Sequence, residues 1–192
     1  TLEQEGYTRL SECGTWDLAV GGKYYVTRNG SALMAFRIPR KDFTGFMMSA
    51  SHSDYPAFRV KENAELTGPE KYLRLNTERY GGQLLSTWLD RPLTVAGRVL
   101  VEEKGAIATK LVYVDKDLLM IPSVAAHMNR EANNGFKFDP KCDMVPLMAL
   151  DTEKGAFRKL VAEAAGCKAE DILGTDLFLC MRQKPLVWGA NG

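Results

Sequence analysis

The sequence has 192 residues, with 25 basic and 24 acidic side chains and therefore a formal net charge of +1. A hydrophobic fraction of 45% and a charged fraction of 26% are typical of a globular protein, which excludes a disordered chain, collagen and a coiled coil. The near-zero charge argues against nucleic acid or an anionic membrane surface as a partner, and no stretch reaches the roughly 20 apolar residues of a membrane helix.

The first 50 residues contain a hairpin signal and one apolar run. The β-rich stretches 23–27 and 32–38 flank Asn29-Gly30, a dipeptide that accepts the positive φ angles of a hairpin turn. The run 45–50 is almost continuously apolar and too short for a helix. It therefore predicts a strand that is buried on both faces of an α/β sheet.

The middle of the chain is expected to be rich in strands. Polar residues 61–65 are interpreted as a linker that follows the first block. Two β-rich runs, 93–101 and 106–114, are joined by a short turn that contains Gly105, so we expect an antiparallel hairpin there.

Two helices and a last strand are predicted in the remainder. Pro122 suits the first turn of a helix that extends to about Asn133. A second helix is predicted over 153–165, because its apolar residues recur at helical spacing and Gly166 follows as a cap. The final strand is predicted over 176–181.

The cysteines and the first residues point to an intracellular setting. Cys13, Cys142, Cys167 and Cys180 are far apart and form no CxxC pair, which is a poor pattern for structural zinc or a disulfide scaffold. Residues 1–5 are polar and acidic, unlike a secretory leader. We therefore expect reduced thiols and a cytoplasmic location.

His52 and Asp54 form a candidate site at the end of the apolar run. In a strand, residues i and i+2 share a face, so Asp54 could accept one ring N–H of His52 and leave the other nitrogen for a metal. The alternative is a partly buried histidine bonded to a neighbouring aspartate. The spacing alone favours this alternative, because the motif is short.

His127 is the second histidine of the chain. Glu131 follows it by four residues, the spacing of helical metal sites, but a solvated His–Glu pair on a helix is favoured on spacing alone. Motifs for nucleotide binding or serine hydrolysis are absent from the sequence. The residues alone therefore leave the chemistry open.

Several motifs taken together resemble one family, the M18 metallo-aminopeptidases of the aspartyl aminopeptidase type. The matching segments, in chain order, are SHSDYPAFRVK at 51–61, ERYGGQLLSTWLDR at 78–91, LTVAGRV at 93–99, IPSVAAHMNR at 121–130 and VPL at 145–147. Each segment is weak alone, but their order and spacing cover most of the chain.

The resemblance implies an α/β fold: the N-terminal part of a zinc-peptidase α/β/α catalytic domain, interrupted by an inserted β-rich dimerisation domain. Residues 1–60 would form the first part of the catalytic domain and 61–175 the insertion. Residues 176–192 would return to the catalytic domain, whose remaining part is expected outside this chain.

The resemblance also implies site roles. His52 matches a metal ligand and Asp54 the catalytic aspartate behind it. His127 matches a catalytic and substrate-binding histidine that reaches the neighbouring subunit's site and polarises the scissile carbonyl. A complete site would hold two zinc ions, with most ligands in the C-terminal portion. The isolated chain is therefore expected to be inactive.

The implied partners are peptide substrates, the C-terminal portion as a separate chain, and further copies in a homo-oligomer, either a dimer or a tetrahedral dodecamer. The enzyme would remove N-terminal residues, with acidic residues as one candidate class. The alternative is a non-catalytic dimerisation or assembly module derived from the same family. Retention of His52, Asp54 and His127 argues against that alternative, because buried or interfacial polar groups are costly to keep without use.

Overall fold

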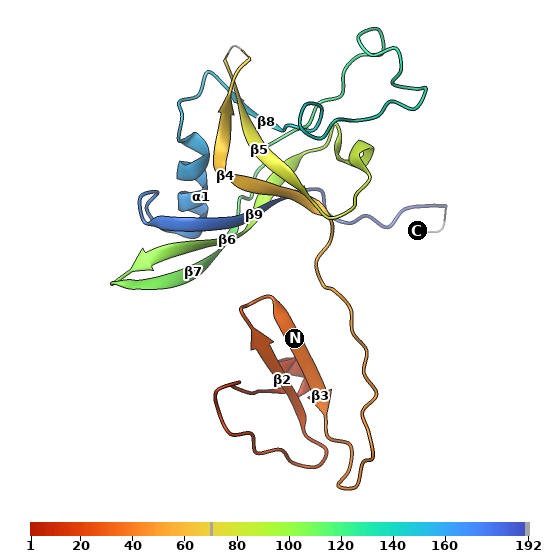
Figure 1. Cartoon of the computed structure of the whole chain (residues 1–192), viewed down its shortest axis with the longest axis vertical. Helices are drawn as coiled ribbons and strands as arrows, with labels where there is room; N and C mark the ends of the chain where they lie inside the picture. The colour runs from red at the N-terminus through yellow and green to blue at the C-terminus, as the bar shows by residue number, and fades with distance from the viewer. Residues whose placement is uncertain (70, 191–192) are drawn as a thin grey trace. The chain divides into compact units, whose positions relative to one another are not determined.

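The computed structural model describes residues 1–69 and 71–190 of the chain (Figure 1). They divide into two compact units, Thr1–Ser53 and Asp54–Gly192. No helix among the described residues is long and apolar enough to cross a bilayer.

The first unit is built around a small three-stranded sheet. Its elements are the 3-10 turn η1 (Glu3–Glu5) and the strands β1 (Thr8–Arg9), β2 (Lys23–Arg28) and β3 (Ala32–Arg37). The strand order is β1-β2-β3, with β1 parallel and β3 antiparallel to β2. Asn29 and Gly30 have φ angles of 53° and 68°, so the predicted hairpin is confirmed and turns as its dipeptide requires.

The strand predicted over 45–50 is wrong. This run forms no strand, and the side chains of Met47 and Met48 are 104% and 91% exposed. A strand needs a neighbour for its backbone hydrogen bonds, and the small sheet ends at β3, whose register pairs all lie on β2. An apolar run without a hydrogen-bonding neighbour therefore stays extended and irregular among the described residues.

The second unit contains a six-stranded antiparallel sheet and one α-helix. Its strands follow the order β7-β6-β9-β4-β5-β8. Their bounds are β4 (Ala57–Thr67), β5 (Tyr72–Tyr80), β6 (Leu93–Glu103), β7 (Ala106–Tyr113), β8 (Leu147–Leu150) and β9 (Ile172–Met181); the 3-10 turn η2 (Leu85–Trp88) and the helix α1 (Ala156–Ala165) complete the unit.

The core of this unit lies between one face of the sheet and α1. Alternate residues of the central strands, including Val99 and Leu177, are fully buried, and the helix adds Phe157 and Val161. Trp88 packs edge-on against Phe58, with ring centroids 5.2 Å apart. The period-2 pattern of the strands thus meets the apolar stripe of the helix, which is the usual way a sheet buries one face.

The two predictions for the middle of the chain, a hairpin and a linker, differ in outcome. The hairpin predicted from 93–101 and 106–114 is confirmed as β6 and β7, with φ angles of 53° at Lys104 and 77° at Gly105 in the turn. The linker predicted over 61–65 is wrong, because these residues continue β4 through a register shift between Val60 and Glu65. These residues are polar because some lie on the exposed side of the strand and Glu65 caps a helix, and not because the chain leaves the sheet there.

The predicted helix over 153–165 is confirmed, with a later start, as α1. Gly166 ends it in the left-handed region at φ 61°. At its start, Gly155 and Phe157 donate their backbone N–H groups to the Glu65 carboxylate at 2.6 and 2.7 Å. A side chain 90 residues upstream therefore satisfies the helix N-terminus and complements its dipole.

The helix predicted from Pro122 to Asn133 is wrong. Residues 122–137 contain no helix and have turns at 126–128 and 130–135, and Val124 and Met128 are 55% and 74% exposed. A short helix is marginal in water unless its apolar face is buried. Since nothing in the described part of the chain buries these apolar side chains, the segment lacks the tertiary contacts that a helix would need there.

Candidate functional site

Asp54 lies in the segment that leads into β4, separated from the strand by Tyr55 and Pro56, and is bonded to the end of β5. The antiparallel register pairs Ala57 with Tyr80, which brings the end of β5 next to the chain entering β4. The Tyr80 hydroxyl donates a hydrogen bond to Asp54 Oδ2. This bond, together with the negative charge of the carboxylate, raises the pKa of Tyr80 above its usual value. The Asp54 carboxylate is therefore oriented by a neutral phenol.

Tyr80 is itself fixed from two sides. Its ring packs edge-on against Phe178 of β9, with centroids 5.2 Å apart. The next residue, Gly81, has a φ of 81°, and a Cβ there would lie 3.3 Å from Pro56. The Tyr80-Gly81 pair thus turns the chain closely over Pro56, which keeps the hydroxyl on Asp54.

An ion-pair network lies beside this cluster on the same sheet. Asp176 of β9 bridges Arg98 of β6, with Nε to Oδ2 at 3.3 Å, and Arg59 of β4, with Nη2 to Oδ1 at 3.5 Å. Arg59 pairs with Phe178 in the strand register, so the network and the Tyr80 ring adjoin. No local sequence pattern marks these three residues, because they are 39 to 117 positions apart and only the strand register brings them together.

His52 belongs to the segment that joins the two units. Residues 51–56 form no strand and the His52 side chain is exposed. His52 and Asp54 therefore do not share the face of a strand, contrary to the expectation from their spacing. The structure defines the surroundings of Asp54, and the metal role of His52 stays a prediction.

His127 lies in the turns of the segment 122–137 and is exposed. Without a helix, the spacing from His127 to Glu131 no longer places the two side chains on one helix face. The start of the segment is clamped by Asp90, whose N–H donates to Ile121 O at 2.9 Å and whose Oδ1 accepts the Ser123 N–H at 2.8 Å. Hydrogen bonding from the Ser123 side chain, and then from its backbone N–H, lowers the pKa of Asp90.

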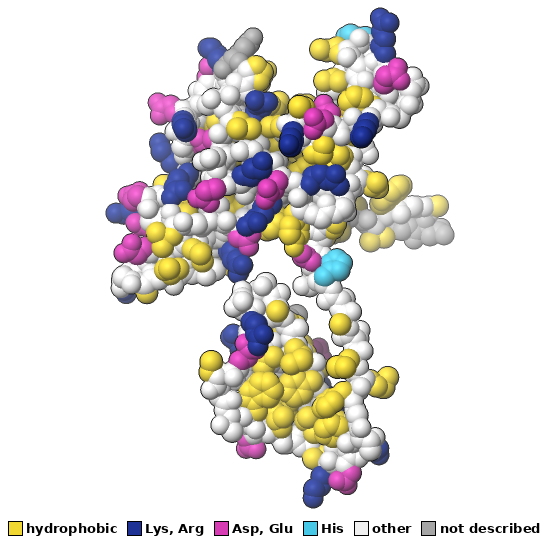
Figure 2. All heavy atoms as spheres, in the orientation of Figure 1, with side chains coloured by type: hydrophobic (Ala, Val, Ile, Leu, Met, Phe, Trp, Pro, Cys, Tyr) yellow, Lys and Arg dark blue, Asp and Glu magenta, His cyan; other side chains and the backbone are white. Residues whose placement is uncertain are grey.

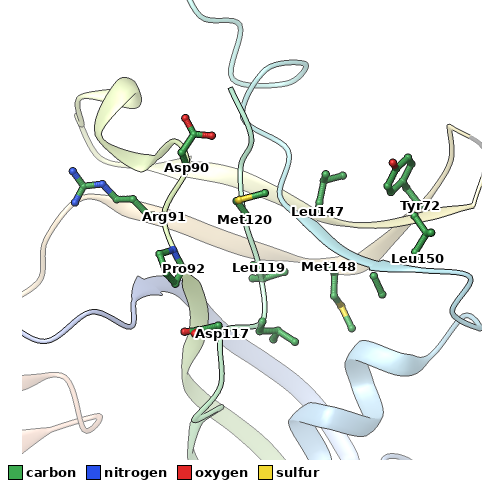
Figure 3. A pocket seen from close by; sticks show the side chains of 12 residues that line it. Tyr72, Asp90, Arg91, Pro92, Asp117, Leu119, Met120, Leu147, Met148 and Leu150 are labelled. Atoms are coloured by element: carbon green, nitrogen blue, oxygen red, sulfur yellow. The ribbon is translucent and has the colours of Figure 1, made fainter. Parts of the chain in front are cut away.

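An apolar groove of about 500 Å³ lies near this clamp (Figure 3). Asp90 and Arg91 lie at one end of it and Tyr72 at the other, with Met120 and Leu147 between them. Its lining includes none of His52, Asp54 and His127. The groove has the apolar character of a packing surface, with one ionic end, and offers no group of converging catalytic side chains.

The described residues do not by themselves form a zinc site. No group of three or more His, Cys, Asp or Glu side chains in 1–69 and 71–190 is placed to hold a metal ion. Zinc sites in proteins have at least three protein ligands. His52 can supply one of them, so the remaining ligands of a site built on it would have to come from outside the described chain.

The comparisons with known proteins decide the family. The model of the family described as "Aminopeptidase I zinc metalloprotease (M18)" matches residues 1–192. The chain belongs to the M18 aminopeptidase family. This membership confirms the resemblance drawn from the motifs, and the M18 family is described as one of zinc metalloproteases.

Two relatives show how much of an M18 protein the chain represents. It is 41% identical over 199 residues to "Probable M18 family aminopeptidase 2" of Clostridium acetobutylicum, covering 100% of this chain and 46% of the relative. The protein of the same name from Clostridium novyi is 38% identical over 196 residues, covering 98% and 45%. The chain therefore spans just under half the length of these relatives.

Solved structures support the M18 fold. Chaetomium thermophilum mApe1 has a TM-score of 0.86 and 31% identity, with 99% of this chain and 47% of that chain covered. The "Ape4 and Nbr1 complex" has a TM-score of 0.90 and 31% identity, with 98% and 40% covered. The "S. cerevesiae mApe1 dodecamer" has a TM-score of 0.73 and 25% identity, with 99% and 44% covered. The expected α/β fold of a partial, N-terminal M18 portion is confirmed.

Proposed function

We propose that this chain is the N-terminal portion of a dinuclear zinc aminopeptidase that releases single residues from the N-termini of peptides, with acidic residues as one candidate class. The observation that carries the proposal is the M18 match over residues 1–192, which includes the segments with His52, Asp54 and His127. The chain spans 46% of its Clostridium acetobutylicum relative. In this proposal the C-terminal portion, as a separate chain, completes the enzyme.

In this proposal His52 provides one zinc ligand, and Asp54 accepts the second ring N–H of His52. Such a carboxylate fixes the tautomer and the orientation of a ligating histidine. The hydrogen bond from Tyr80 to Asp54 supports this role, because it helps to fix the orientation of the carboxylate. Two zinc ions per site, with the remaining ligands in the C-terminal portion, complete the proposal.

We assign residues 1–60 to the catalytic domain, 61–175 to the inserted dimerisation domain and 176–192 to the return strand. The division of the described chain into units at 53/54 supports a boundary near the first of these positions. Strand β9 crosses the second boundary and pairs with β6 and β4, so this pairing gives no support to a boundary at 175/176, which rests on the family resemblance.

His127 would act in the active site of a neighbouring copy in the cytoplasmic homo-oligomer, a dimer or a dodecamer. Its exposure supports this role, and so does the Asp90 clamp, which holds the base of the segment carrying it. There the imidazole would donate a hydrogen bond to the developing oxyanion of the scissile carbonyl, an interaction that strengthens in the transition state.

The proposal is tested by mixing this chain with the C-terminal portion and zinc and measuring release of p-nitroaniline from aminoacyl substrates. We expect turnover from the mixture and none from either chain alone. His52→Ala should abolish turnover in the mixture, whereas Cys13→Ala, also exposed and in the same unit, should not. An assembled, zinc-loaded complex without turnover would instead establish the assembly-module alternative.

A further inference from the structure

The outer strand of the large sheet, β7, carries an apolar face that nothing in the described unit covers. Its odd-numbered residues are Ile107, Thr109, Leu111 and Tyr113, which we call the β7 stripe. Ile107, Leu111 and Tyr113 are 70%, 81% and 50% exposed. Figure 2 shows hydrophobic side chains gathered over the β6–β7 hairpin. Leu100 of β6, opposite Thr109, extends this surface and is 40% exposed.

The backbone along this strand is also available for pairing. β7 is the end strand of the sheet, and its register pairs run only to β6. A two-residue hairpin turn makes Glu103 and Ala106 a hydrogen-bonded pair. Because such pairs alternate along an antiparallel ladder, the backbone groups of residues 106, 108, 110 and 112 form their hydrogen bonds with β6. The N–H and C=O groups of the β7 stripe residues therefore point outward from the sheet edge.

The edge lacks the charges that usually prevent pairing. Lys110 is the single charged residue of β7, and it belongs to the opposite face. Its Nζ lies 2.6 Å from Glu103 Oε1 and donates to Gly166 O at 3.3 Å. Soluble proteins commonly protect sheet edges with exposed lysines, prolines or bulges, and β7 has an unbroken register and none of these on its outer side.

The other edge of the sheet is protected. β8 has four residues, and Leu147 exchanges two backbone hydrogen bonds with Met120, at 2.8 and 3.1 Å, on the side away from β5. Strand pairing at that edge is therefore blocked by the chain itself. This contrast singles out β7 as the open edge of the described sheet.

We infer that β7 is a self-association surface, at which two copies of this chain pair their β7 strands antiparallel about a two-fold axis at Thr109. In this register Ile107 of one copy faces Leu111 of the other and the two Thr109 residues face each other. Apolar cross-strand pairs and Thr–Thr pairs both stabilise a sheet. The pairing closes after two copies, because a two-fold interface uses the same patch on both.

A second copy fits this edge because the β7 stripe is uncharged and matches itself in the antiparallel register. The inference rests on the proposed homo-oligomer and names the surface that one of its contacts would use. It needs neither zinc nor the C-terminal portion, so its test is separate from the activity assay. One strand pair with a few apolar side chains is smaller than the roughly 1,600 Å² of a standard interface, so we expect micromolar self-association.

Two matched pairs of variants test the surface by sedimentation velocity and oxidative crosslinking of the 192-residue chain. Leu111→Lys places two unpaired charges at the interface and should raise the dissociation constant at least about tenfold. Leu150→Lys, at the opposite edge strand and 57% exposed, is the control and should leave it unchanged. Circular dichroism verifies that both variants keep their fold.

In a Cys13→Ser, Cys142→Ser background, Thr109→Cys should form a covalent dimer on oxidation. Hydrogen-bonded antiparallel pairs have Cα atoms about 5.5 Å apart, within the range of a disulfide. Thr152→Cys, which is also exposed, should stay monomeric on denaturing gels. A wild-type chain that is monomeric at all concentrations, or a folded Leu111→Lys variant that associates like wild type, would overturn the inference.

Discussion

Replacing Glu65 tests whether a side chain of β4 holds the start of α1. Its two carboxylate oxygens accept the Gly155 and Phe157 N–H groups at 2.6 and 2.7 Å, and Gly155 itself provides no side-chain cap. A hydrogen bond to a charged group contributes about 1.5–3 kcal/mol, whereas loss of a cap costs about 0.5–2 kcal/mol. Because water can reach the freed N–H groups of this half-buried site, we expect Glu65→Ala to lower the free energy of unfolding by about 2–3 kcal/mol.

The measurement is thermal unfolding followed by circular dichroism at 222 nm, which reports on α1. For a chain of this size, 1 kcal/mol corresponds to about 2–4 °C in Tm, so the expected shift is about 4–12 °C. Glu65→Gln keeps one acceptor and loses the charge, so its shift should be intermediate. Glu62→Ala, exposed on the same strand, should shift Tm by less than about 2 °C. Equal midpoints for Glu65→Ala and Glu62→Ala would refute the capping argument.

Two further changes test the sheet and the Asp54 cluster. Gly97→Ala should severely reduce the yield of soluble folded protein, because Gly97 has a φ of 149° and a Cβ there would collide with the backbone oxygen of Asp176. Gly174→Ala is the control, since a Cβ at Gly174 would have no neighbour within 4 Å. Equal yields of the two variants would contradict the close approach of β9 to Gly97. Asp54→Asn should lower the pKa of Tyr80, since the carboxylate that raises it loses its charge. Ultraviolet titration of phenolate absorbance measures the pKa of Tyr80, and Asp151→Asn is the control. A titration curve for Asp54→Asn that matches wild type, or that shifts no more than the curve of the control, would show that the Asp54 charge does not affect Tyr80.

The turns of the fold could be predicted because their signals are local. Asn29-Gly30 and the turn at Lys104-Gly105 require positive φ angles that few dipeptides accept, and both hairpins form as expected. The helix α1 combines an apolar stripe with a terminal glycine, again within a dozen residues. Sequence patterns that span a dozen residues or fewer determine the conformation of their own segment largely without contacts from the rest of the chain.

The errors arise where the outcome depends on distant partners. The run 45–50 has the composition of a buried strand but no neighbouring strand among the described residues, and residues 122–133 have a helical start without a surface to bury their apolar face. Residues 61–65 carry the polarity of a linker, yet Glu65 is polar because it caps a helix 90 positions away. Composition alone cannot distinguish these cases.

In the candidate site, too, some residues could be predicted from a local motif and others could not. The motif containing His52 and Asp54 is visible in the sequence, whereas the Tyr80 hydroxyl on Asp54 and the bridge from Asp176 to Arg59 and Arg98 depend on strand register. Register is a property of the assembled sheet, so the supporting residues emerged from the structure. The ligating and catalytic roles of His52 and His127 rest on the family resemblance and stay predictions.

The central claim is that each active site combines His52 of one copy with His127 of a neighbour. The most direct test mixes inactive His52→Ala and His127→Ala subunits, each with its C-terminal portion, and measures aminopeptidase turnover after exchange. In a two-fold dimer, one site of each mixed pair keeps both histidines, so random mixing predicts recovery of about a quarter of wild-type activity. If His127 serves its own subunit, or has no role in the site, mixing will give no more activity than the two variants show separately.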